Sequence, residues 1–116
     1  MNFNELLIKK KEIKRLKGCN YIYLLIEREF IKTNENIYKL GRTNSEINIR
    51  FLQYPKNSKL LFYTQVFDCI ITEDIIIKEC CKLFIQRKDI GKEYFEGDIN
   101  EIIKVISDIC LKYPKN

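Results

Sequence analysis

Apolar and basic positions alternate with the period of an α-helix over the first part of the chain. The apolar face of this helix, predicted over residues 3–17, consists of Phe3, Leu6, Leu7, Ile13 and Leu16. Its remaining surface is rich in lysine, and Gly18 is a residue type that commonly follows the last turn of a helix. The pattern therefore predicts a basic amphipathic N-terminal helix within residues 1–18 and a separate folded region over residues 19–116.

Three longer runs of β-branched and aromatic residues predict strands. The first covers residues 20–28 (NYIYLLIER) and the second covers residues 37–41 (IYKLG), with the polar segment 33–36 (TNEN) between them. Because two such runs joined by a short polar segment usually pair, we expect an antiparallel hairpin. The third run, residues 59–68 (KLLFYTQVFD), predicts a strand beside that hairpin, and a short further strand is compatible with Tyr94–Phe95.

A potential capping box marks the start of a helix after the second strand. Thr43 and Glu46 stand three residues apart, the spacing at which each side chain can bond the other residue's backbone N–H. This spacing predicts a helix over residues 45–53, which Pro55 would end.

Two longer helices are predicted in the second half of the chain. Thr72 is the expected N-cap of a helix that continues to about residue 86. Asp98 and Glu101 form a second capping box, which opens a helix over residues 99–112. Its expected buried face is Ile102, Ile103, Ile106, Ile109 and Cys110. The order of elements predicts an α+β fold, with a three-stranded, mostly antiparallel sheet flanked by helices and an extra N-terminal helix.

Length and composition narrow the class of protein. The 116 residues suffice for one domain, and the 46% hydrophobic and 32% charged content is that of a globular protein. No apolar run approaches the roughly 18–20 residues that a membrane span needs. The chain's start also lacks the apolar core of a signal peptide. We therefore expect an intracellular protein that does not contact a membrane.

The net charge of +5 is unevenly distributed. Residues 1–18 hold six Lys or Arg against Glu5 and Glu12, so the rest of the chain is almost neutral. An anionic partner such as nucleic acid suits this excess, although a solvated basic surface explains it equally well.

Five cysteines and no histidine exclude several chemistries. The cysteines form no C-x-x-C pair and offer no structural zinc site, and Ser-His and Cys-His nucleophiles are impossible. We expect the thiols to be small buried apolar groups in a reducing compartment. Any catalysis must then use tyrosine, lysine, arginine and carboxylates.

Several short motifs occur in a recognisable order. Tyr21-Ile22-Tyr23 lies in the first predicted strand, and Lys39-Leu40-Gly41-Arg42-Thr43 spans the second. Arg50 follows on a predicted helix, glutamates follow on the helix after the third strand, and Glu93-Tyr94-Phe95 comes near the end. From residue 20 to about 110 the chain resembles the GIY-YIG nuclease superfamily. It is most similar to a small branch found in phages and large DNA viruses, with a KIGRT-like second motif and a late E-[WY]-F motif.

The resemblance implies a metal-dependent DNA endonuclease that uses Mg²⁺ or Mn²⁺ and no small-molecule cofactor. Tyr23 matches the tyrosine that closes the GIY motif, whereas Tyr21 stands where that motif has glycine. Lys39 takes the place of the first tyrosine of YIG, and Gly41 matches its glycine. Arg50 matches the helical arginine.

The same resemblance implies a glutamate as the metal ligand. Glu73 is the first choice, Glu79 on the same helix the second, and Glu93 the third. The residues expected to contact DNA are Arg42, Arg50, Lys10 and Lys14.

Phosphodiester hydrolysis needs an activated water and stabilisation of charge at phosphorus. The family's occasional helix histidine is absent, so proton transfer would rest on Tyr23, Lys39 and water. A tyrosine or lysine that acts as a base needs a pKa lowered from about 10. Tyr23 and Lys39 can serve one site only if the register of the hairpin places them on one face of the sheet.

Simpler interpretations stand beside each assignment. Tyr23 has the pattern of a half-buried strand aromatic, Arg50 could pair with Glu46 one helical turn earlier, and Glu73 could merely complement a helix dipole. Three functions therefore stay open: an endonuclease, a degenerate domain that binds DNA without cutting it, and an interaction protein whose basic helix docks a partner.

Overall fold

The structure is a computed structural model, and it describes residues 20–45 and 47–112. The predicted N-terminal helix over residues 3–17, with Lys10 and Lys14, lies outside the described residues, as does Glu46. Within the described residues, no helix is long and apolar enough to cross a membrane.

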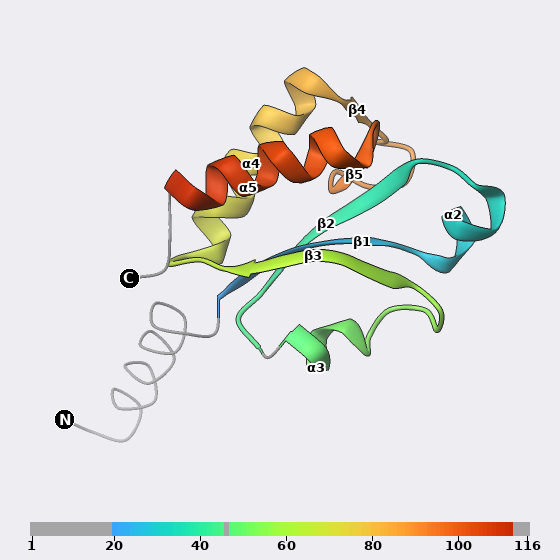
Figure 1. Ribbon diagram of the computed structural model, residues 1–116, viewed down its shortest axis with the longest axis horizontal. Coiled ribbons are helices and arrows are strands. Elements are labelled where there is room, and N and C mark those ends of the chain that lie inside the picture. Colours follow the sequence, from blue (N-terminus) through green and yellow to red (C-terminus); the bar gives the residue numbers. More distant parts are fainter. Residues whose placement is uncertain (1–19, 46, 113–116) are drawn as a thin grey trace.

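Over residues 20–45 and 47–112 the sheet has five strands, so the expectation of three was wrong. Its strands are β1 (Tyr21–Ile26), β2 (Ile37–Thr43), β3 (Lys59–Gln65), β4 (Ile85–Gln86) and β5 (Tyr94–Glu96). They lie in the order β3-β1-β2-β5-β4, and every neighbouring pair is antiparallel (Figure 1). The predicted hairpin of β1 and β2, with β3 beside it, is confirmed. Strand β5 includes Tyr94–Phe95, where a short further strand was expected, whereas β4 was not predicted, because its two residues are too few to produce a readable alternation.

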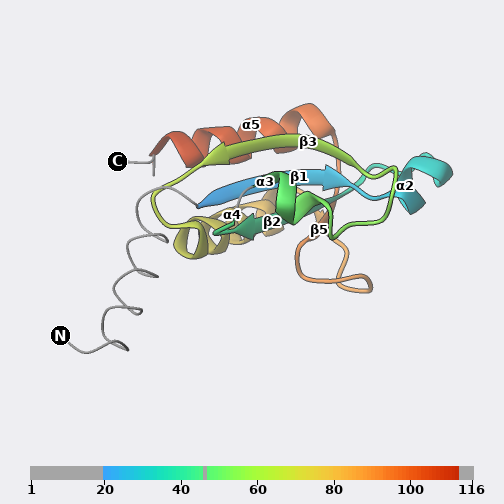
Figure 2. The ribbon, with the colours of Figure 1, turned by 90° about the horizontal axis from the view of Figure 1, so that it is seen from below.

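Helices cover both faces of this sheet. These helices are α3 (Ile47–Phe51), α4 (Cys69–Leu83) and α5 (Ile99–Lys112), and a further helix, α2 (Arg28–Thr33), lies in the connection from β1 to β2. The two long helices, α4 and α5, lie side by side over one face, and the short helix α3 lies on the other (Figures 1 and 2). The predicted α+β class, with a mostly antiparallel sheet flanked by helices, is thus confirmed.

The start and the end of α4 differ from the prediction. Asp68, and not Thr72, is the N-cap, because its Oδ1 accepts hydrogen bonds from the backbone N–H groups of Ile70 (3.0 Å) and Ile71 (3.3 Å). Thr72 lies one turn inside the helix, where its hydroxyl donates to the Asp68 carbonyl. The helix stops at Leu83 because the next residues leave it to pair with β5.

Helix α2 was not predicted. It occupies the end of the first predicted strand and part of the connection to the second. Asn34 ends it in the left-handed conformation (φ 58°), with its N–H directed back to the carbonyl groups of Ile31 and Phe30. A helix of six residues carries too little periodicity to stand out from the strand pattern before it.

The last helix agrees with its prediction. The backbone N–H of Glu101 donates to Oδ1 of Asp98 (3.1 Å), which confirms the first half of that capping box. The main core lies between α4, α5 and the sheet and contains Ile22, Leu24, Leu40, Ile76, Ile102 and Ile106. Of the described cysteines, Cys69, Cys80 and Cys110 are buried and Cys81 is exposed, and all four are free thiols.

The register of the hairpin decides which side chains share the other face. Tyr23 lies opposite Gly41, and Leu25 lies opposite Lys39. Because directly opposed residues project to the same side, Tyr23, Gly41 and Lys39 all lie on the face that α3 partly covers. The requirement that Tyr23 and Lys39 share a face is met.

Candidate functional site

A small hollow of about 180 Å³ lies beside the last residues of β2. Strand β5 pairs with β2 only as far as Lys39, and one further bond joins the Leu40 N–H to the Glu93 carbonyl. Beyond that point, side chains from both faces of the sheet meet at its edge. The hollow is lined by Tyr23, Gly41, Arg42, Arg50, Glu73 and Glu93. Every one of these is a candidate from the sequence.

Tyr23 lines the hollow, and its side chain is almost fully buried. Its hydroxyl lies 2.6 Å from the Tyr54 hydroxyl and accepts a hydrogen bond from Nε of Arg50 (3.0 Å). Burial, followed by the hydrogen bond with Tyr54, raises the pKa of Tyr23 well above its ordinary value. This direction is the opposite of what a base requires, so Tyr23 is built to remain a neutral hydrogen-bonding group.

Gly41 has a steric reason to be glycine. The ring of Tyr23 lies directly across it, and a Cβ atom at this position would overlap the end of the ring and its hydroxyl. The glycine therefore lets Tyr23 reach past β2 to the hollow.

Arg50 reaches the hollow from α3. Its Nε donates to Tyr23, its Nη1 donates to Oε1 of Gln53, and its guanidinium lies 5.3 Å from the centre of the Tyr54 ring. These contacts fix the direction of the guanidinium, which is the group best suited to a bidentate contact with phosphate.

Tyr54 is a site residue that the sequence analysis did not identify. It bonds Tyr23, and the cations of Arg50 and Lys39 both lie against its ring. Burial raises the pKa of Tyr54 above its ordinary value. Tyr54 lies beyond Phe51, the last residue of α3, so helical spacing from Arg50 gave no signal for it.

Lys39 lies next to the hollow and does not line it. Its ammonium is 4.9 Å from the centre of the Tyr54 ring and 5.6 Å from that of Tyr94, its cross-strand neighbour. Oε2 of Glu93 is 3.9 Å away. The cation is thus held between two aromatic rings and a carboxylate at the edge of the hollow.

Glu73 enters from α4, on the other face of the sheet. It is buried, and its Oε1 accepts a hydrogen bond from Nε of Arg42 (3.1 Å). Burial first, and the neighbouring charge of Glu93 second, raise the pKa of Glu73, and Arg42 opposes them. Two carboxylates near one another in a partly desolvated hollow attract a cation.

The donor set limits the kind of metal ion that fits. Among the residues that the structure describes, no group of three or more His, Cys, Asp or Glu side chains could hold an ion. Glu73 and Glu93 nevertheless line the same hollow. Mg²⁺ binds through one or two carboxylates and keeps several waters. The hollow therefore suits a hard divalent ion that keeps several water ligands, rather than an ion coordinated entirely by protein side chains.

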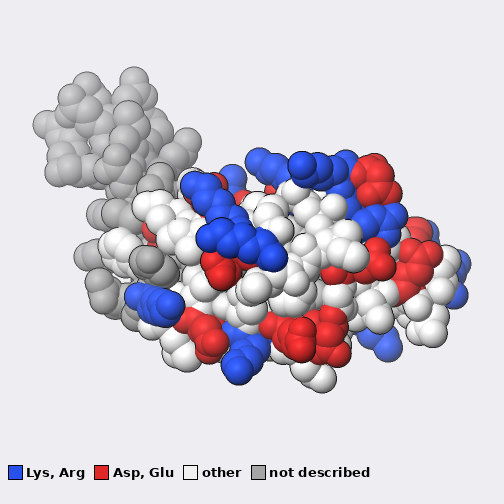
Figure 3. Space-filling view, turned by 90° about the horizontal axis from the view of Figure 1, so that it is seen from above, with Lys and Arg blue, Asp and Glu red and all other residues white. Residues whose placement is uncertain are grey.

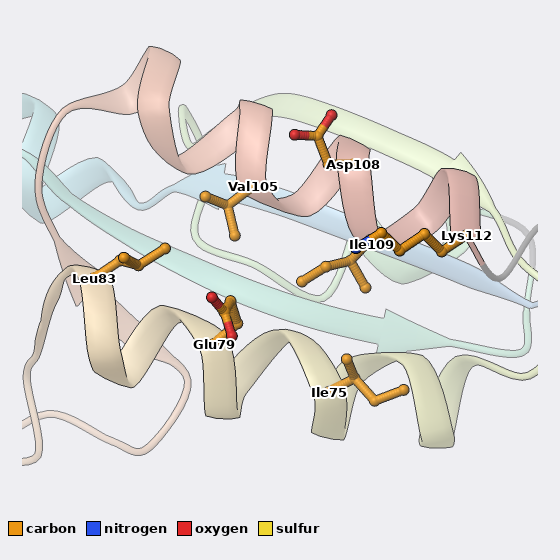
Figure 4. A pocket seen from close by; sticks show the side chains of 7 residues that line it. All are labelled: Ile75, Glu79, Leu83, Val105, Asp108, Ile109 and Lys112. Atoms are coloured by element: carbon orange, nitrogen blue, oxygen red, sulfur yellow. The ribbon is translucent and has the colours of Figure 1, made fainter.

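Glu79 and Tyr21 lie apart from this cluster. Glu79 lines a groove of about 320 Å³ between α4 and α5, together with apolar side chains such as Ile75 and Val105 (Figure 4). It pairs with Lys82 (3.7 Å). The Tyr21 hydroxyl accepts a hydrogen bond from Nε2 of Gln65, and its ring packs against another tyrosine. The second choice of metal ligand, Glu79, is not brought to the site, whereas the third, Glu93, is.

Basic and acidic side chains are interspersed on the side of the two long helices (Figure 3). Lys78 pairs with Asp74 (2.9 Å), and Arg87 pairs with both Asp89 (2.8 Å) and Glu96 (2.9 Å). Such mixed charges create little net field over this face. Among the candidate DNA contacts that the structure describes, Arg42 and Arg50 both line the hollow.

Comparison with known proteins matches most of the described residues to a domain family. The profile of the T5orf172 domain matches residues 18–110, a span that includes every residue lining the hollow. No curated protein and no solved structure matches the chain.

Proposed function

Because the chain belongs to the T5orf172 domain family, a phage-associated family related to nuclease-like folds, we propose that it is a metal-dependent DNA endonuclease with a GIY-YIG-type site. The observation that carries this proposal is the convergence in one hollow of a hydroxyl, a guanidinium and two carboxylates, from Tyr23, Arg50, Glu73 and Glu93. These are the groups that phosphodiester hydrolysis uses.

In this reaction a water oxygen bonds to phosphorus and one phosphorus–oxygen ester bond breaks. The water loses a proton and the departing oxygen takes one up, which leaves a phosphomonoester and an alcohol. Arg50 balances the charge that grows on the non-bridging oxygens. Tyr23 keeps its proton and aligns the water or the phosphate by hydrogen bonding. The ammonium of Lys39, at the edge of the hollow, can donate a proton to the departing oxygen.

Glu73 and Glu93 would hold the metal ion. Because Arg42 already donates to Glu73, a bound ion would have to share this carboxylate with the guanidinium or displace it. Such an ion would polarise the phosphate and acidify a bound water. If the guanidinium were displaced, Arg42 would be able to contact a DNA phosphate.

The test is nicking of supercoiled plasmid with Mg²⁺ or Mn²⁺. Glu73→Gln keeps the side chain's shape and removes its charge, so it should abolish nicking and spare or tighten DNA binding. Arg50→Ala should reduce both, with a loss of transition-state stabilisation of about 3 kcal/mol, or roughly 10²-fold in rate. Glu79→Gln is the matched control, because it changes a carboxylate on the same helix that lines the other groove.

Wild-type nicking by Glu73→Gln would move the metal ligand elsewhere. Glu93→Gln should then be tested before Glu79→Gln, because Glu93 lines the hollow. If all three carboxylates are dispensable and the protein still binds DNA, the endonuclease proposal fails.

One observation favours DNA binding without cleavage as the second candidate. The ion pair between Arg42 and Glu73 already neutralises the buried carboxylate without a metal. A degenerate domain would bind DNA with an affinity that falls with salt and would cut with neither Mg²⁺ nor Mn²⁺.

A further inference from the structure

Glu27, at the start of α2, is linked to the candidate site through Tyr94. Its Oε1 accepts a hydrogen bond of 2.6 Å from the Tyr94 hydroxyl. Glu27 is the N-cap residue of α2, a position where a side chain often accepts a backbone N–H, yet it makes no such bond. The carboxylate is turned towards Tyr94 instead.

Tyr94 joins this carboxylate to Lys39. The two residues are cross-strand neighbours in β2 and β5, and the ammonium of Lys39 lies 5.6 Å from the centre of the Tyr94 ring. The Tyr94 ring also packs against Phe30 in α2, with their planes at 68° to one another. Burial, and then the bond to Glu27, raise the pKa of Tyr94, so its hydroxyl stays protonated and keeps donating. The Tyr94 ring is thereby held by its hydroxyl as well as by its bond to the backbone of β5.

A fixed ring matters because a lysine side chain has four rotatable bonds and a strong preference for water. The side chain of Lys39 is only 19% exposed, and its ammonium lies between Tyr54 and Tyr94. A cation is attracted to the face of a ring, so a rotated Tyr94 would no longer hold it there.

We propose that Glu27 is a positioning residue for the candidate site, which fixes the ring of Tyr94 and through it the ammonium of Lys39 beside Tyr54 and Glu93. The inference rests on the proposed function in so far as Lys39 takes part in cleavage. Glu27 does not line the hollow, and its effect is therefore exerted through Tyr94.

The first test does not depend on catalysis. In protein carrying ¹³C-labelled lysine, ring currents should shift the ε-methylene signals of Lys39 upfield, and Lys39→Arg identifies them. Glu27→Ala and Tyr94→Phe should each reduce this shift, and the double variant should reduce it no further. Glu27→Gln should retain the upfield shift, because the amide oxygen still accepts a hydrogen bond from the Tyr94 hydroxyl. Glu35→Ala is the control, since Glu35 is exposed near the same helix. Lys39 signals that stay unchanged in Glu27→Ala would overturn the proposal.

The second test uses plasmid nicking by the same variants. Glu27→Ala should lower kcat roughly tenfold and leave KM unchanged, because it misplaces a group in the site without removing a DNA contact. Glu27→Gln should restore the rate, and a rate loss that Glu27→Gln shares with Glu27→Ala would contradict the proposal. If the wild-type protein does not nick DNA at all, the proposed function fails, and the NMR experiment alone decides whether Glu27 positions Lys39.

Discussion

The hydroxyl of Tyr23 should stabilise the fold as well as organise the site. Tyr23→Phe keeps the buried ring and removes only the oxygen, which takes part in the bonds with Tyr54 and Arg50. We expect the variant to fold and to lose stability, because Tyr54 and Arg50 each lose a partner.

The size of the loss follows from the two bonds. A hydrogen bond between neutral groups contributes about 1 kcal/mol. The bond from Arg50 involves a charge, but the guanidinium is partly exposed, so solvent reduces its contribution to about 1 kcal/mol as well. Tyr23→Phe should therefore cost about 2 kcal/mol, or roughly 8 °C in Tm for a domain of this length.

Urea unfolding of a double-mutant cycle measures the two contributions separately. Tyr54→Phe should cost about 1 kcal/mol, since it removes only the bond between the hydroxyls. The double variant should cost little more than Tyr23→Phe, which gives a coupling energy of about 1 kcal/mol. Tyr63→Phe is the control, because Tyr63 is the cross-strand partner of Tyr23 and its side chain is half exposed.

Additive losses would refute this reasoning. If the two single variants summed to the double within about 0.3 kcal/mol, the hydroxyls would not interact in solution. An equal loss in Tyr63→Phe would show that any tyrosine on this sheet contributes as much.

Three other perturbations test the same site and the N-terminal segment. Gly41→Ala should destabilise the protein by about 1–3 kcal/mol in urea unfolding, because its Cβ displaces the Tyr23 ring, and Tyr23→Ala in the same chain should relieve most of that effect. Glu73 has a raised pKa in the folded state, so its ionisation lowers stability as pH rises from its unfolded pKa of about 4.3 to its folded pKa, and has no effect at lower pH. Glu73→Gln should accordingly be more stable than wild type at pH 7, and this advantage should vanish towards pH 4; an advantage independent of pH would contradict the assignment. A chain lacking residues 1–17 should bind DNA more weakly and with a flatter dependence on salt, by about one unit of slope per lost phosphate contact, whereas an unchanged slope in a binding titration would assign that segment to another role.

Local sequence patterns were enough to predict much of the architecture. The positions of β1, β2, β3 and α5 follow from hydrophobic periodicity and capping residues, which depend only on neighbours in the chain. The same alternation placed Tyr23 and Lys39 on one face as soon as the hairpin register was known. The family resemblance supplied the candidates Arg50 and Glu73, which the fold brings to one hollow.

Other features depend on partners that are distant in sequence. Strand β4 exists because residues 85–86 pair with β5, and this pairing ends α4 three residues earlier than its periodicity predicts. Asp68 is the N-cap instead of Thr72, because the helix begins soon after the chain leaves β3. The first turn of the helix therefore lies before Thr72.

The choice among the glutamates was also made by tertiary structure. Glu73 and Glu79 both lie on α4, and no local sequence pattern shows which of them faces the site. The helical period fixes their directions relative to one another, but not which direction faces the sheet. Packing of α4 on the sheet turns Glu73 to the edge of β2 and Glu79 to the groove beside α5. The sequence by itself determined the strands β1, β2 and β3, the last helix and the types of residue available for chemistry. Only the tertiary structure at the edge of the sheet decided which of these residues lie together. A site whose side chains come from both faces of a sheet leaves no periodic pattern in the sequence that could predict it.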